Sequence, residues 1–277
     1  MTEVSGKTVW ITGASSGIGR AMAREFSDNG ASIILSGRRV EALATLANEL
    51  STPALIIPFE TTDFDNLEAR VSDAWAWNKR VDILINNAGV GQRSLAIDTD
   101  PEVYKDLINV DLLAPIWLTQ LQLRRMADAG GGHIVGISSV TGRLGSPMRT
   151  GYCAAKHGLI GYMEALRAEV CLHHNIQVTS ILPGSIATDV ARNALTADGS
   201  NRGRSDVNID EGDDPGDCAK AILAAVKDNV PELIFAKGVE LEYAKLRHAD
   251  PDKYFEMAAQ MGAEIAAQGV PDIVRHE

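Results

Sequence analysis

The sequence has no long apolar run and few cysteines. None of its 277 residues belong to an apolar stretch of the ~18 residues that a membrane-spanning helix needs, and the N-terminal segment lacks the basic and apolar regions of a signal peptide. We therefore expect no membrane span. The three cysteines, Cys153, Cys171 and Cys218, are scattered and odd in number, which favours free thiols and a cytoplasmic location over a disulfide framework.

Positive charge is also in short supply. The chain carries 26 lysine and arginine residues against 37 aspartate and glutamate residues, a formal net charge of -11. So acidic a chain is a poor match for the phosphate backbone of nucleic acids, and we expect no nucleic-acid partner. His173 and His174 are adjacent at the end of a predicted helix and point in different directions, so we expect no metal site.

What the sequence does contain is an alternation of short apolar segments with longer segments of helical periodicity. The apolar segments span residues 7–12, 31–36, 54–59, 81–85, 132–138, 176–182 and 231–235. Strands that alternate with helices form a parallel sheet covered on both faces, and right-handed crossovers bring all strand carboxyl ends to one edge. The sequence thus predicts an α/β fold: a Rossmann-type, doubly wound parallel sheet of about seven strands in a single domain.

The second half of the chain suggests two additions to this domain. Residues 1–235 contain the predicted catalytic domain, and a polar run at about 190–213 is long for a plain connection. Long loops of this kind often cover a site, so we predict a substrate lid there. Residues 236–277 are charged and helical in pattern, and we expect them to form an extension packed on the same domain.

A glycine-rich turn follows the first predicted strand. Residues 13–19 read GASSGIG and lead into a helical segment at residues 20–29. Backbone N–H groups in such a turn can approach a pyrophosphate, and the start of the helix favours negative charge. The spacing is G-x-x-x-G-x-G rather than the general G-x-G-x-x-G fingerprint, and an ordinary glycine turn that opens a helix is the alternative.

The second predicted strand ends without the carboxylate that NAD-binding units place near the ribose 2′-hydroxyl. Arg38 and Arg39 lie there instead, and Glu41 is the first acidic residue after them. Because arginine offers a planar fork of donors to a phosphate, we favour NADP(H) over NAD(H) as the cofactor. Two solvated arginines at a helix start are the alternative.

Tyr152 and Lys156 are one helical turn apart, so their side chains share one face of the predicted helix. A nearby ammonium favours the phenolate and lowers the tyrosine pKa from its free value of ~10. We predict that this pair gives or takes a hydroxyl proton while a nicotinamide moves a hydride. Ser139, at the end of the fifth strand, and Asn109, within a helix predicted over residues 101–126, are further candidates.

These motifs, taken in order, resemble the short-chain dehydrogenase/reductase family over residues 7–235. The resemblance is carried by the turn at residues 12–19, by Asn-Asn-Ala-Gly at residues 86–89 and by the Pro-Gly run at residues 183–188. We expect the following residues to bind the cofactor: Gly13, Ser15, Ser16, Gly17, Ile18, Gly19, Arg38, Arg39, Glu60, Thr61, Asn87, Ala88, Gly89, Tyr152, Lys156, Pro183, Gly184, Ile186 and Thr188.

The resemblance also implies a role for each of four catalytic residues. Tyr152 would be the general acid in reduction and the general base in oxidation, and Lys156 would hold the nicotinamide ribose and lower the pKa of the phenol. Ser139 would hydrogen-bond the substrate oxygen, and Asn109 would support a water through which the proton is replenished. The sequence departs from the family at Glu60, where members commonly have Asp.

The function that follows is NADP(H)-dependent interconversion of a ketone or aldehyde and an alcohol, by a homodimer or homotetramer. Two segments, GSPMRTGY and NALTADGS, resemble a branch of membrane-anchored reductases and hint at a lipophilic substrate. A stripe of Leu159, Met163, Leu166 and Val170 would supply either core packing or a subunit contact. An NAD(H)-dependent alcohol dehydrogenase of the same fold and a non-catalytic nucleotide-binding scaffold are the alternatives.

Overall fold

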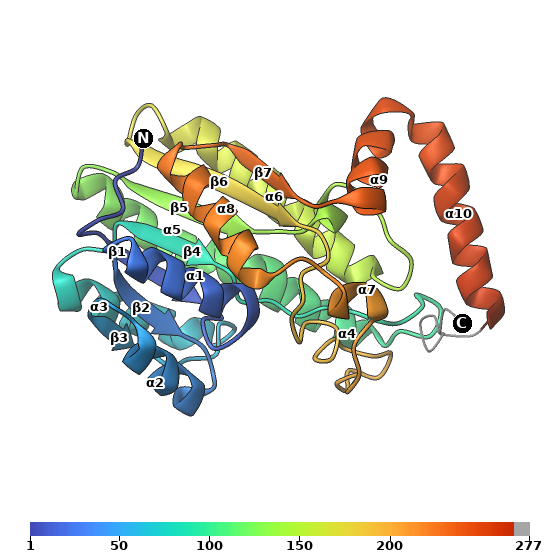
Figure 1. The fold of residues 1–277 in the computed structure, drawn as a ribbon, viewed down its shortest axis with the longest axis horizontal. Helices are drawn as coiled ribbons and strands as arrows, with labels where there is room; N and C mark the ends of the chain where they lie inside the picture. The colour runs from blue at the N-terminus through green and yellow to red at the C-terminus, as the bar shows by residue number, and fades with distance from the viewer. Residues whose placement is uncertain (269–277) are drawn as a thin grey trace.

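The computed structural model describes residues 1–268, and a seven-stranded parallel sheet forms its centre (Figure 1). The spatial order is β3-β2-β1-β4-β5-β6-β7, so the winding direction changes between β1 and β4. The strands are β1 (Thr8–Thr12), β2 (Ser32–Ser36), β3 (Ala54–Ile56), β4 (Ile83–Asn86), β5 (Gly132–Ile137), β6 (Ile176–Pro183) and β7 (Glu232–Phe235). The predicted fold class is confirmed.

Two layers of helices cover the sheet, because side chains alternate between its faces along each strand. Val9 and Ile11 of β1 belong to the core on one face, and Trp10 belongs to the core on the other. Helices α1 (Gly17–Asp28), α2 (Val40–Glu49) and α8 (Pro215–Lys227) contribute to the first core, and α3 (Leu67–Asn78), α5 (Ala114–Asp128) and α6 (Thr150–Val170) contribute to the second.

The helix predicted over residues 101–126 is present but is divided in three. Asp100 caps α4 (Pro101–Ile108) by accepting a hydrogen bond from the Glu102 N–H, and Pro101 occupies the first turn. The chain then follows a π-helical segment, Asn109–Leu113, before α5 begins. A π segment widens one turn and so changes the direction of the side chains that it carries.

The apolar stripe of α6 is core. Leu159, Met163, Leu166 and Val170 are at most 6% exposed and pack against the sheet with Trp10 and its neighbours. The stripe therefore supports the packing interpretation and not a subunit contact. It fixes the rotation of α6 about its axis, and so determines which way Tyr152 and Lys156 face.

The chain after β7 is helical as far as Gln268, and the remainder of the predicted extension lies outside the described residues. Helices α9 (Gly238–Ala249) and α10 (Pro251–Gln268) lie side by side at one end of the molecule (Figure 1). The Tyr254 hydroxyl donates to the Gly145 carbonyl, which connects α10 to the loop before α6. A short helix, α7 (Val207–Asp210), interrupts the polar run predicted as a lid.

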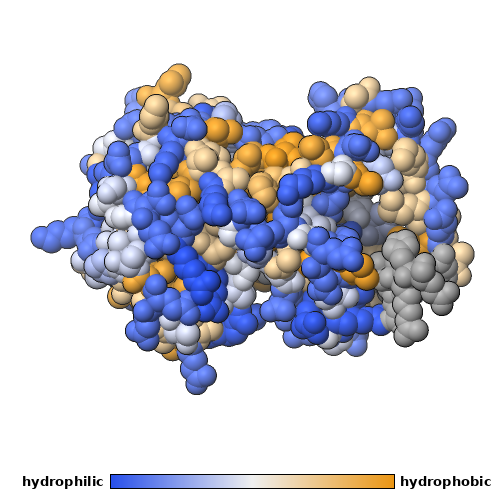
Figure 2. Space-filling model, viewed as in Figure 1, coloured by the Kyte–Doolittle hydropathy of each residue, from blue (hydrophilic) through white to orange (hydrophobic). Residues whose placement is uncertain are grey.

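Hydrophilic side chains dominate the face drawn in Figure 2, as expected for an acidic chain, with an apolar strip across its upper middle. Within residues 1–268, no helix is long and apolar enough to cross a membrane. The same residues contain no group of three metal-ligating side chains that could hold a metal ion.

Candidate active site

An open cavity of about 570 Å³ lies at the carboxyl ends of the strands. All residues predicted to bind the cofactor line it, and so do Ser139, Tyr152 and Lys156. Asn109 does not line it. The fold therefore brings distant parts of the chain together at one edge of the sheet, as the parallel topology requires.

The glycine turn forms one end of this cavity. A Cβ atom on Gly19 would collide with the Gly13 carbonyl, so only glycine lets α1 approach the end of β1 this closely. Ser16 precedes α1 but makes no side-chain hydrogen bond to it, so the first N–H groups of the helix lack a side-chain cap. An uncapped helix start in a glycine turn is suited to a phosphate group.

Asn87 fixes the turn to the end of β4. Its amide donates to the carbonyls of Thr12 and Gly13 at 2.9 and 3.2 Å. The Thr12 hydroxyl in turn accepts from the backbone N–H groups of Asn87 and Ala88 at 3.0 and 3.1 Å. These four bonds hold two neighbouring strand ends at a constant separation, which is what a rigid cofactor site requires.

Two arginines lie beside the turn. The Arg39 guanidinium donates to the Ser15 hydroxyl at 3.0 Å, and Arg38 forms an ion pair with Glu60 at 3.3 Å. Arg38 is 80% exposed in its side chain, so this pair contributes little to stability. Both guanidiniums are close enough to the cavity to meet an anionic group bound at its end.

Gln92 holds the start of α6, a contact that the sequence did not reveal. Its side-chain carbonyl accepts from the backbone N–H groups of Gly151 and Tyr152 at 2.8 and 3.2 Å. Arg149, the residue before the helix, makes no side-chain cap. Gln92 is fully buried, so it satisfies two N–H groups that no water could reach from that side.

Lys156 lies against Tyr152, as predicted, and its side chain is only 5% exposed. Its Nζ atom is 5.6 Å from the centre of the Tyr152 ring and donates to the Ile137 carbonyl at 3.1 Å. It also forms an ion pair with Asp111 at 3.0 Å. An ammonium has three donors, so one remains for a ligand in the cavity.

From the α4–α5 region, Asp106, Val110 and Asp111 line the cavity, whereas Asn109 does not. The Asp111 side chain is fully buried, and its carboxylate accepts from the Val90 backbone N–H at 3.2 Å. Asn109 and Asp111 lie in the same π-helical segment but point in different directions, and only Asp111 faces Lys156. The catalytic role of Asn109 stays a prediction, and Asp111 is a further charged residue that lies against Lys156.

The expected lowering of the Tyr152 pKa is corrected. Burial raises the pKa of Tyr152 above its usual 10, and the negative charge of Asp111 acts in the same direction. Lys156 opposes this rise, as predicted, together with a hydrogen bond from Ser139 and the more distant charge of Arg93. The opposing contributions are smaller than the effect of burial, so the phenol is the stable form at neutral pH.

Ser139 lies at the end of β5 and lines the cavity between Tyr152 and the loop after β6. Its hydroxyl accepts from the Thr141 hydroxyl at 3.0 Å and donates weakly to the Pro183 carbonyl at 3.4 Å. The long bond to Pro183 costs little to exchange for a stronger acceptor. Ser139 is thus placed to donate to an oxygen bound beside Tyr152.

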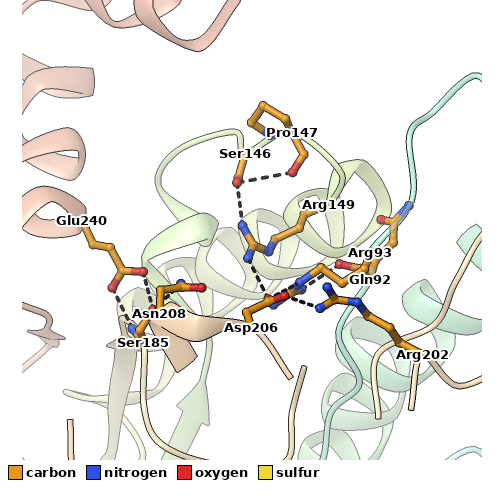
Figure 3. A network of polar contacts seen from close by, with 10 residues as sticks. All are labelled: Gln92, Arg93, Ser146, Pro147, Arg149, Ser185, Arg202, Asp206, Asn208 and Glu240. Atoms are coloured by element: carbon orange, nitrogen blue, oxygen red, sulfur yellow. Dashed lines mark hydrogen bonds and ion pairs between the residues drawn. The ribbon is translucent and has the colours of Figure 1, made fainter. Parts of the chain in front are cut away.

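The polar run predicted as a lid contacts the cavity and is fixed to the domain body by charge (Figure 3). Asp206, fully buried, forms ion pairs with Arg93 at 2.6 Å, with Arg149 at 3.8 Å and with Arg202. Burial raises the pKa of Asp206, but the guanidiniums outweigh it and hold that pKa below its usual range. Three separate parts of the chain meet at this carboxylate.

The same view shows Glu240 of α9 directed at the loop after β6 (Figure 3). Its carboxylate accepts hydrogen bonds from Ser185, and the Asn208 amide donates to the Ser185 hydroxyl. Pro183 at the end of β6 and Gly184 in this loop both line the cavity. The C-terminal extension is therefore in direct contact with a wall of the site.

A comparison with protein families identifies the family of this chain. Residues 7–199 match the family model described as short chain dehydrogenase. The chain is 36% identical over 265 residues to the dehydrogenase/reductase SDR family member 7B of Bos taurus, covering 92% of this chain and 81% of the relative. Its identity to the protein of the same name from Danio rerio is 38% over 270 residues, covering 93% and 86%.

Solved structures show the same architecture. A short chain dehydrogenase/reductase from Burkholderia phymatum, crystallised in complex with NAD, superimposes with a TM-score of 0.82 at 22% identity, covering 91% of this chain and 96% of its own. A short-chain dehydrogenase from Streptomyces avermitilis gives a TM-score of 0.79 at 28% identity, covering 95% and 96%. At 22% identity, the similarity to the Burkholderia phymatum protein shows a shared fold and nothing more.

Proposed function

Because this chain belongs to the short-chain dehydrogenase/reductase family, we propose that it is an NADP(H)-dependent oxidoreductase that interconverts a ketone or aldehyde and an alcohol. One observation carries the proposal. The buried Tyr152–Lys156 pair opens into the same cavity as the glycine turn, so a proton donor and a dinucleotide cradle share one space. That combination is what hydride transfer to a carbonyl needs.

The residues present fit a nicotinamide dinucleotide. The uncapped start of α1 and the packed glycines suit the pyrophosphate, and the remaining Lys156 donor suits a ribose hydroxyl. Asn87, Ala88 and Gly89 also line the cavity, and the small size of Ala88 and Gly89 would let a bound ring approach the backbone there. The cofactor, when bound, supplies or accepts the hydride.

The chain's own residues handle the proton. In reduction, the Tyr152 hydroxyl gives its proton to the oxygen that gains negative charge, and Ser139 donates a hydrogen bond to the same oxygen. In oxidation, the phenolate takes the hydroxyl proton back. Because burial raises the pKa of Tyr152, the protonated form dominates at neutral pH, which suits the reductive direction.

The preference for NADP(H) rests on Arg38 and Arg39. Both arginines line the cavity, Arg39 beside Ser15 and Arg38 beside Glu60, and a 2′-phosphate bound there would meet donors and positive charge. The test compares kcat/KM with NADPH and NADH in the natural chain and in Arg39→Ala. We expect NADPH to be preferred at least tenfold and the substitution to remove most of that preference. A higher kcat/KM with NADH in the natural chain would overturn the assignment.

We propose a lipophilic carbonyl or alcohol as the substrate. The loop after β4 and the lid contribute the apolar side chains of Val90, Val190, Leu195 and Ile209 to the cavity wall, beside the polar side chains of Asn193 and Asn201. Apolar walls favour an apolar substrate in proportion to the area that they bury. A screen of carbonyl compounds of rising chain length, followed by nicotinamide absorbance, should show kcat/KM increasing with length. A maximum at the shortest compounds would contradict this.

The homodimer or homotetramer and the cytoplasmic location stay predictions. The α6 stripe lends the oligomer no support because it is buried, but β7 forms an open edge of the sheet and its Ile234 is 38% exposed. An exposed edge strand can pair with a second copy of the same chain. A monomeric mass by light scattering at micromolar concentration would count against an oligomer.

A further inference from the structure

The starting point is the π-helical segment between α4 and α5. Asp111 lies at its centre and is fully buried, with its carboxylate 3.0 Å from the Lys156 ammonium. π segments are rare and need a specific cause, since they replace favourable α-helical hydrogen bonds. Here the segment directs the Asp111 carboxylate into the cavity and against Lys156. No charged side chain of the two preceding turns of α4 forms a described ion pair with Lys156.

The surroundings are built to hold this carboxylate. The Val90 N–H donates to it at 3.2 Å. Gly89 makes room for it, since a Cβ atom at that position would lie 2.5 Å from the Asp111 Oδ1 atom and 3.4 Å from the Lys156 Nζ atom. Asp111 and Lys156 therefore form a close ion pair whose side chains are almost completely buried, and the absence of a side chain at Gly89 leaves the space that the pair occupies.

Such a pair changes what Lys156 can do to Tyr152. A lone buried ammonium would favour the phenolate strongly, because an opposite charge nearby is felt more in a low-dielectric interior. A carboxylate 3.0 Å from that ammonium cancels most of the field that reaches the phenol. The groups that face Tyr152 are Lys156 on its own helix, Asp111 from the π segment, Ser139 from the end of β5 and Arg93 from the loop after β4.

Accordingly, we propose that Asp111 is a positioning residue that keeps Tyr152 protonated to higher pH, by pairing with Lys156. The inference rests on the proposed function. Its consequence is that the site works as a proton donor over a wide pH range and becomes a base only under alkaline conditions. The pKa values of both Tyr152 and Lys156 are raised, and the negative charge of Asp111 contributes to each.

The test is an optical titration of Tyr152 in the full-length protein. The ultraviolet absorbance of tyrosinate is recorded against pH, and the curve of Tyr152→Phe is subtracted, so that only Tyr152 remains. We expect a pKa at or above the ordinary ~10 in the natural chain, and a pKa lower by about 1–3 units in Asp111→Asn. Asn has the shape of Asp and can still accept from Val90, so folding should be retained.

Glu102→Gln is the matched control, since it also removes one negative charge from this stretch of helix. Glu102 is exposed and pairs only with Lys105 within the described contacts, so its loss should leave the Tyr152 pKa unchanged. An equal or higher Tyr152 pKa in Asp111→Asn would overturn the proposal. If that variant does not fold, a pKa well below 10 in the natural chain would overturn it by itself.

Kinetics separate this inference from the proposed function. In the direction of alcohol oxidation, kcat/KM should begin to rise at a pH about 1–3 units lower in Asp111→Asn than in the natural chain. Turnover without any such shift would refute the role of Asp111 alone. An absence of turnover with every carbonyl and alcohol tested would refute the proposed function, and the optical titration would still decide the role of Asp111.

Discussion

The carboxylate of Glu240 accepts hydrogen bonds from both the backbone N–H and the hydroxyl of Ser185, each at 2.7 Å. Glu240 belongs to α9, and Ser185 belongs to the loop that follows β6 and borders the cavity. Bonds to an ionised acceptor are among the stronger hydrogen bonds in proteins. An extension late in the chain thus fixes a loop whose other residues are expected to contact the cofactor.

Glu240→Ala should therefore weaken cofactor binding more than it weakens the fold. We expect the KM for the cofactor to rise at least about tenfold, since one charged hydrogen bond contributes about 1.5–3 kcal/mol, and kcat to change little. The control is Glu242→Gln, an exposed glutamate of the same helix. Equal KM values in Glu240→Ala and in the natural chain would show that α9 has no influence on the loop.

Gln92→Leu should affect catalysis through the position of Tyr152. Leucine fills a similar space but leaves the N–H groups of Gly151 and Tyr152 without their buried acceptor. The expected cost is about 1–3 kcal/mol in the free energy of unfolding, with a larger fall in kcat than in cofactor affinity. Urea unfolding and isothermal titration measure the two effects. Gln120→Leu, which removes an exposed glutamine of α5, serves as the control.

Asp206→Asn should loosen the lid. The change leaves the guanidiniums of Arg93, Arg149 and Arg202 around a neutral group in a buried place, and breaking such a pair costs about 3–5 kcal/mol. Backbone hydrogen exchange should accelerate in residues 190–213 and remain unchanged in the sheet. Glu211→Gln, at an exposed position in the same segment, should have no such effect.

Two outcomes would contradict this account of residues 190–213. Exchange as slow as that of the sheet, without any ligand, would rule out a lid that opens. Unchanged exchange in Asp206→Asn would show that the buried carboxylate does not hold the segment.

Stability should fall in mild acid because of His133. Burial, with a smaller contribution from Arg167, lowers the pKa of His133 from 6.5 to about 3. The unfolded chain therefore binds a proton on His133 below about pH 6.5, while the folded chain does not until about pH 3. Folding stability that is complete above pH 6.5 is lost as the pH falls through this window, by at most about 1.4 kcal/mol per pH unit.

The comparison for this prediction is His133→Asn, followed by urea unfolding at pH 7.5 and pH 5.5. The variant will have its own stability at pH 7.5, since His133 hydrogen-bonds Thr179 at 2.9 Å. The informative quantity is the difference between the two pH values, which should be smaller in the variant. An identical difference in both proteins would assign the acid sensitivity to other groups.

Much of the site could be predicted because a parallel sheet brings the residues that follow its strands to one edge. A turn of glycines after the first strand, small residues after the fourth and a Tyr–Lys pair one helical turn apart are all local patterns, and strand ends converge at one edge in any doubly wound sheet. The cavity lining confirms that these patterns meet. The meeting of these motifs follows from the order of strands and helices alone, without knowledge of individual side-chain contacts.

Asp111 was missed because it depends on a feature that leaves no periodic signal. The apolar spacing of residues 101–126 is compatible with one continuous α-helix, and no local motif singles out Asp111. The π segment changes the direction of the side chains within it and brings Asp111 to the cavity. The direction of the Tyr152 pKa was wrong for a related reason. Burial and the carboxylate of Asp111, which is distant in sequence but close in space, together outweigh the effect of the Lys156 ammonium on that pKa.

Gln92 and Asp206 were missed because their partners are far away in sequence. Gln92 accepts a hydrogen bond from Gly151 at the start of α6, 59 residues later, and Asp206 pairs with Arg93 across 113 residues. Neither residue belongs to a short motif. Gln92 lies in a loop and Asp206 lies in the segment predicted as a lid, and only folding shows that both side chains are buried.

The central claim is tested most directly by Tyr152→Phe, which removes one hydroxyl and leaves the ring in place. The measurement is kcat for carbonyl reduction together with the dissociation constant of NADPH. A proton donor of this kind contributes about 10²–10⁴ in rate, so kcat should fall by that factor while NADPH binding stays within about twofold of the natural chain. A kcat equal to that of the natural chain, with the same substrate, would contradict the account.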